Sequence, residues 1–90
     1  MAIKLDPLLE EYLSGATAFG FSDLLEVIVE YFEFPDFSDV SWLENIGAIV
    51  TGGSKILPVL YATVSKNMIF EIEKNPKVRR ISLSGGVTPL

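Results

Sequence analysis

Three glutamates in the first half of the chain, Glu26, Glu30 and Glu33, recur at helical spacing and could act together chemically. Carboxylates that share one site can exchange protons with a substrate or bind a hard cation. However, no Asp-rich, Gly-containing loop of the kind that binds calcium accompanies them. With Asp23 they form a polar stripe of period 3.6, which favours a solvated helix face. We expect this face to bind a basic partner rather than a metal ion.

Four cations lie close together in the second half of the sequence: Lys74, Lys77, Arg79 and Arg80. Such a group could neutralise nucleic-acid phosphates. The chain as a whole carries a charge of −5, and that charge repels the same phosphates. An acidic protein partner is therefore at least as good an interpretation, and we predict these four residues as interaction residues.

The residue types that most often do chemistry are missing, because the chain has neither His nor Cys. It therefore has no imidazole base for neutral pH and no thiolate for a metal. The stretch 47–54 nearly fits a phosphate-binding loop, but Gly53 stands where that loop needs lysine. We predict no catalytic, cofactor-binding or metal-binding residues, no cofactor, and a protein that is not an enzyme.

The charges are divided between the two halves of the sequence. Residues 1–54 hold ten acidic residues and one lysine, a charge of −9, whereas residues 55–90 hold six basic and two acidic residues, a charge of +4. The halves could neutralise each other within one molecule, or between copies in an array. A third interpretation is that both are ordinary solvated faces.

The chain is also apolar for its length, with a mean hydropathy of +0.39. This composition indicates apolar surface that a partner or a membrane covers. The most apolar stretch, 46–64, contains Lys55, a glycine pair and Pro58, which suit a spanning helix poorly. No signal peptide is evident at the N-terminus, so a cytoplasmic or virion location is expected.

Helical spacing dominates our prediction of the elements that must position these residues. A strand over 23–33 is disfavoured because alternation would place Ile28 and Phe32 on the same face as Glu26 and Glu30. We predict a mainly α fold in which residues 1–76 form one small domain and residues 77–90 an extended C-terminal arm. The expected helices span residues 7–14, 23–33, 39–51 and 55–74. The alternative is an α+β fold with a β-meander over 56–84.

The tripeptide Phe-Ser-Asp occurs at 21–23 and at 37–39, and both copies are interpreted as helix starts. For the second copy, Ser38 or Ser41 is the expected cap, with a capping box from Ser41 to Glu44. Phe37 and Trp42 would then form a hydrophobic staple. Trp42 is also a candidate interface anchor, since tryptophan is enriched among binding hot spots.

These observations favour a non-catalytic structural or assembly subunit of a larger complex. A component of a phage or virus particle is one concrete form, such as a minor capsid, decoration, connector or tail protein. The expected partners are protein subunits, copies of itself among them, while nucleic acid and membrane are less favoured. Two alternatives remain: an adaptor or regulatory subunit docking on an enzyme or membrane complex, and a nucleic-acid-associated protein using its basic C-terminal segment.

Overall fold

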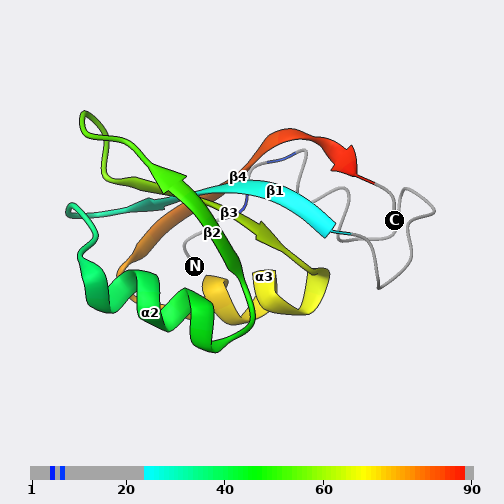
Figure 1. Cartoon of the computed structure of the whole chain (residues 1–90), viewed down its shortest axis with the longest axis horizontal. Helices are drawn as coiled ribbons and strands as arrows, with labels where there is room; N and C mark the ends of the chain where they lie inside the picture. Colours follow the sequence, from blue (N-terminus) through cyan, green and yellow to red (C-terminus); the bar gives the residue numbers. More distant parts are fainter. Residues whose placement is uncertain (1–4, 6, 8–23, 89–90) are drawn as a thin grey trace.

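The part of the chain that the structure describes forms a four-stranded antiparallel sheet with two helices (Figure 1). The computed structural model describes residues 5, 7 and 24–88. The elements in chain order are β1 (Leu24–Tyr31), α2 (Phe37–Asn45), β2 (Ile49–Gly53), β3 (Val59–Val64), α3 (Lys66–Glu73) and β4 (Val78–Thr88).

Across the sheet the strands follow the order β2-β3-β1-β4, so that β1 and β3 lie in the centre. All three strand pairs are antiparallel. The element order βαββαβ with this strand order is the split βαβ topology of ferredoxin-like folds. That topology occurs with many unrelated functions, so it identifies none.

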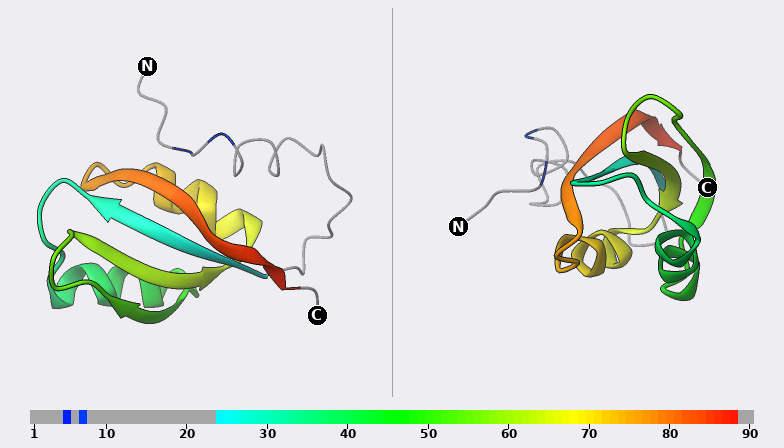
Figure 2. Two further views of the ribbon diagram at one scale, coloured as in Figure 1. Left: turned by 90° about the horizontal axis from the view of Figure 1, so that it is seen from above. Right: turned by 90° about the vertical axis from the view of Figure 1, so that its left-hand side faces the viewer.

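Both helices lie on the same side of the sheet (Figure 2). We call the side under α2 and α3 the covered face, and the opposite side the open face. Along β1, Leu25, Val27, Val29 and Tyr31 are all buried on the covered face. They join buried residues of both helices, such as Leu43, Ile69 and Ile72, in one core. Burial of these apolar side chains is the main force that holds the two layers together.

The predicted mainly α, four-helix fold is wrong, and the segment 23–33 shows why. It forms strand β1. Glu26 and Glu30 lie four residues apart, a spacing that places two side chains on one face of a helix and equally on one face of a strand. Ile28 does share their face, as the rejected strand interpretation required, because the open face of an antiparallel sheet tolerates a mixture of polar and apolar residues.

The predicted helix over 55–74 is also wrong, since β3 and α3 occupy that segment. The alternative meander over 56–84 is closer: its first and third segments are strands. Its middle segment forms α3 instead, where Ile69 and Ile72 are both buried. A spacing of three residues puts these two on one face of a helix but on opposite faces of a strand.

The predicted helix 39–51 corresponds only in part to α2, which ends at Asn45. Gly47 then turns the chain into β2 with a φ of +100°, a conformation that side chains other than glycine rarely adopt. The glycine pair at 52–53 lies within β2 rather than ending a helix. The predicted helix 7–14 falls outside the described residues except for Pro7.

The predicted extended arm is wrong as well, because β4 continues the sheet to Thr88. It pairs with β1 from the Leu24–Thr88 pair to the Tyr31–Val78 pair, with two register shifts. Val78 and Ile81 are fully buried in the core. In the described part of the chain, neither helix has the length and apolar character needed to cross a membrane.

Candidate interaction site

A groove lies at the end of the covered layer, where β1 ends, α2 begins and the α3–β4 turn passes beside them. It consists of two adjoining pockets that share Asp39, Pro76 and Lys77. The larger, of about 490 Å³, is also lined by Trp42 and Lys74, and we call it the Trp42 pocket. The smaller, of about 330 Å³, is lined further by side chains of the β1–α2 connection, and we call it the Phe34 pocket.

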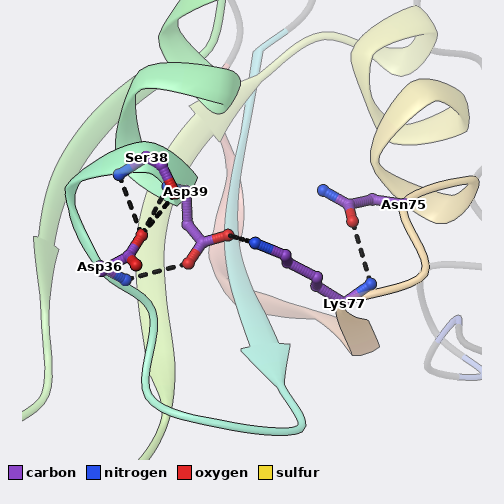
Figure 3. A network of polar contacts seen from close by, with 5 residues as sticks. All are labelled: Asp36, Ser38, Asp39, Asn75 and Lys77. Carbon is purple, nitrogen blue, oxygen red and sulfur yellow. Dashed lines mark hydrogen bonds and ion pairs between the residues drawn. The ribbon is translucent and has the colours of Figure 1, made fainter.

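The start of α2 forms one wall of the groove and is fixed by two aspartates (Figure 3). Asp36 is the N-cap: its Oδ1 accepts hydrogen bonds from the backbone N–H of Ser38 at 3.0 Å and of Asp39 at 3.3 Å. In return, the backbone N–H of Asp36 donates to Oδ2 of Asp39 at 2.9 Å. This reciprocal arrangement satisfies N–H groups that have no partner within the helix.

The cap differs from the predicted one. Asp36 takes the place expected for Ser38 or Ser41, and the capping box runs from Asp36 to Asp39. The predicted staple also fails, because Phe37 is 82% exposed. Hydrogen bonds from the hydroxyl and N–H of Ser38 and from the N–H of Asp39 lower the pKa of the Asp36 carboxyl. Asp36 is therefore a negative charge at the mouth of the Phe34 pocket.

An ion pair between Asp39 and Lys77 crosses the middle of the groove (Figure 3). The Lys77 Nζ lies 3.6 Å from Asp39 Oδ1, and the Asp39 side chain is only 10% exposed. Lys77 approaches from the α3–β4 turn, where its backbone N–H donates to Asn75 Oδ1 at 3.0 Å. The pair joins the acidic half of the sequence to the basic half.

Tyr31, the last residue of β1, is one of the residues that line the Phe34 pocket. The residue is 2% exposed, and its hydroxyl has no hydrogen-bond partner among the described residues. Burial, and to a smaller extent the negative charge of Asp39, raise the pKa of Tyr31 to about 12. Tyr31 consequently keeps its proton at neutral pH, which suits a hydrogen-bonding group better than a general base.

Beside the groove, the molecule exposes large apolar side chains from two segments. Phe32 and Phe34 come from the β1–α2 connection and Phe37 is the first residue of α2, while Ile56 and Leu57 come from the β2–β3 loop. Both segments leave the same end of the sheet, because the backbone N–H of Tyr31, at the end of β1, donates to the carbonyl of Pro58, just before β3, at 2.8 Å. We call this surface the apolar end; its most exposed members, Ile56 and Phe37, are 85% and 82% accessible.

Four of the predicted interaction residues line the groove: Glu33, Trp42, Lys74 and Lys77. The other four lie elsewhere on the sheet. Arg79 forms an ion pair with Glu30, and Arg80 stands opposite Glu30 in the β1–β4 register. Glu26 lines a separate shallow pocket on the open face with Thr51 and Tyr61. The predicted glutamate stripe is thus divided between the open face and the Phe34 pocket.

The charge division is in part intramolecular, as one of the sequence interpretations held. Lys77 pairs with Asp39 and Arg79 with Glu30, so each pair joins the two halves. Lys74 pairs with Glu71 one helical turn before it. Lys74, Lys77 and Arg79 are therefore held by carboxylates of the same chain.

Several residues of the site were not predicted: Tyr31, Asp36, Asp39 and the three exposed phenylalanines. The run FEFPDF over 32–37 held a usable signal, since three phenylalanines around a proline do not fit the interior of a helix. Among the described residues there is no cluster of three or more His, Cys, Asp or Glu side chains that could hold a metal ion. No family model, curated protein or solved structure matches the chain.

Proposed function

We propose that this protein is a non-catalytic subunit that assembles with other protein subunits through its apolar end. The observation that carries the proposal is the presence of five exposed large apolar side chains in residues 32–37 and 56–57, segments that leave the same end of the sheet. Exposed apolar patches of this kind mark protein-binding surfaces. Burying one phenylalanine side chain contributes roughly 1.5–3 kcal/mol, so three of them can dominate an interface.

The groove beside the apolar end supports the same proposal, because it offers polar groups next to apolar ones. Trp42 and Lys74 line one pocket and Glu33 the other, while the Asp39–Lys77 pair lies between them. Interfaces typically combine an apolar centre with a polar rim. A component of a phage or virus particle is one form of such a subunit, and an adaptor on a larger enzyme complex is another.

Binding of nucleic acid through Lys74, Lys77, Arg79 and Arg80 is supported less well. Carboxylates already neutralise three of these cations within the chain. A phosphate backbone would have to compete with Glu71, Asp39 and Glu30 for them.

The test compares the wild-type chain with the triple variant Phe32→Ser, Phe34→Ser, Phe37→Ser. We expect wild type to self-associate in sedimentation velocity, or to retain a defined protein when purified from its source cells. The variant should lose at least about tenfold in affinity, since each lost ring removes more than 1.4 kcal/mol of apolar burial. Phe70→Ser is the matched control, because Phe70 is an exposed phenylalanine on α3. The proposal fails if wild type and triple variant are equally monomeric and retain the same proteins.

A further inference from the structure

The Phe34 pocket carries an excess of negative charge. Three carboxylates line it, from Glu33, Asp36 and Asp39, against the single ammonium group of Lys77. Both oxygens of Asp39 are directed within the molecule, one to the Asp36 N–H and one to Lys77. Glu33 and Asp36 are exposed residues of the lining, and Oδ1 of Asp36 accepts the hydrogen bonds that cap α2.

The lining of the pocket also includes apolar side chains and the buried Tyr31. Phe32 and Phe34 are more than half exposed, so their rings are accessible to a ligand. Aromatic rings attract organic cations through their faces. The buried Tyr31 hydroxyl, which has no partner among the described residues, can accept a hydrogen bond from a group that enters the pocket.

We propose that the Phe34 pocket receives a lysine or arginine side chain of the partner protein. This inference rests on the proposed function and names the chemistry of the partner. The alkyl part of such a side chain packs against Phe32 and Phe34, while its charged head reaches the carboxylates of Glu33, Asp36 and Asp39. Its N–H groups are donors only, which matches a pocket whose free groups are mainly acceptors.

Lys77 acts as an internal competitor for this site. Its ammonium group lies 3.6 Å from Asp39 Oδ1, longer than the 2.7–2.9 Å of a strong charge-assisted hydrogen bond, and its side chain is 63% exposed. A cation from a partner can therefore displace Lys77 toward solvent without breaking a tight contact. An anion would find the nearby N–H groups of α2 already capped by Asp36.

The experiment is a titration of the isotope-labelled full chain, followed by amide chemical shifts in two-dimensional NMR. The probe is n-butylguanidinium chloride, which carries the alkyl and cationic groups of arginine. We expect saturable shifts confined to residues 31–39 and 75–78. At matched concentration, n-butanol tests the alkyl part alone, and sodium chloride and sodium acetate test ionic strength and anions.

Matched variants then separate the contributions. Glu33→Gln should weaken binding about twofold to fivefold, which is the range for one exposed charge pair. The control variant Glu44→Gln should leave binding unchanged. Glu44 is an exposed residue of α2 and does not line the pocket. Lys77→Met should strengthen binding by a similar factor, because it removes the competitor while keeping most of the alkyl stem.

The inference is overturned if n-butanol or acetate produces the same saturable shifts, or if Lys77→Met weakens binding of the guanidinium. Its failure can be told apart from failure of the proposed function. If assembly depends on the phenylalanines but the pocket does not bind the guanidinium probe, only this inference is refuted and the proposed function stands. If the pocket binds the guanidinium probe but assembly does not depend on the phenylalanines, the proposed function is refuted, and the pocket is then a site for small organic cations.

Discussion

The two faces of the sheet differ in how deeply their side chains are buried, and β1 contributes residues to both faces. On the covered face, Leu25, Val27 and Val29 are fully buried. On the open face, Glu26 is exposed and Ile28 is half-buried between its neighbours. The covered face therefore supplies most of the apolar burial that stabilises the fold, while the open face carries a mixture of charged, polar and apolar residues.

This difference explains where the groove lies. Polar groups are costly inside the covered layer, so they occur where that layer ends. Tyr31 is the last residue of β1 on the covered face, and Asp39 belongs to the first turn of α2. The residues of the site are thus attached to the packed core and still lie where a partner can reach them.

We expect the largest difference in stability between the two faces from alanine substitutions at two adjacent leucines. Leu25→Ala leaves a cavity in the core, and we expect it to lower the free energy of unfolding by about 2–5 kcal/mol. Leu24→Ala, on the open face, should cost less than about 1 kcal/mol because that residue is only partly buried. Urea denaturation of both variants measures the difference; equal losses would mean that the open face is buried as well.

A pair of glycines gives the next effect. Gly47→Ala forces a side chain into a φ of +100° and brings its Cβ to 2.8 Å from Met68 Cε, so we expect a loss of about 1–3 kcal/mol. Gly52→Ala on β2 meets only Tyr61 Cδ2 at 3.8 Å, an ordinary contact, and should be nearly neutral. Thermal unfolding compares the two. A Gly47→Ala variant as stable as wild type would contradict the turn geometry.

The buried Tyr31 hydroxyl predicts a loss of stability at alkaline pH. Its pKa rises from 10.0 to about 12 on folding, so the unfolded chain releases the proton first. The stability that the neutral hydroxyl contributes is present below pH 10 and is lost between pH 10 and 12, at no more than about 1.4 kcal/mol per pH unit. Tyr31→Phe should remove this part of the pH dependence. Identical alkaline slopes for variant and wild type in denaturation experiments would show that the hydroxyl ionises freely.

The two ion pairs that join the halves of the sequence should have the smallest effects. Double-mutant cycles with Asp39→Asn and Lys77→Met, and with Glu30→Gln and Arg79→Met, should each give coupling energies of about 0.2–1 kcal/mol. Both cations are mostly exposed, so 1 M salt should reduce the values. A coupling well above 1 kcal/mol that survives salt would place that pair in the core.

The interaction residues predicted from residue type alone remain predictions, although the structure does place several of them together. Trp42, Lys74 and Lys77 were predicted as interaction residues from type alone, and the structure brings them into one groove. A helix start near residue 38 was also recognised, because the local capping chemistry of aspartate and serine does not depend on the rest of the chain.

The sheet could not be recognised from spacing, because spacings of four residues suit helices and strands alike. Ile56, Leu60, Val64, Met68 and Ile72 form such a row, yet it spans a loop, β3 and α3. The contact between Asp39 and Lys77 depends on how β4 aligns with β1, and strand register is a property of the whole sheet. Tyr31 becomes part of a site only through that alignment.

The position of β1 between β3 and β4 has a consequence for how the protein is made. Val29 pairs with Leu60 on one side and with Ile81 on the other, both far along the chain. During synthesis, β1 therefore leaves the ribosome long before either neighbour exists, and one flank stays bare until β4 emerges. Folds dominated by such distant pairings form slowly, and until they form their unpaired strand edges are prone to aggregation. Pairing of the residues after Lys77 with β1 is thus the closing step of folding.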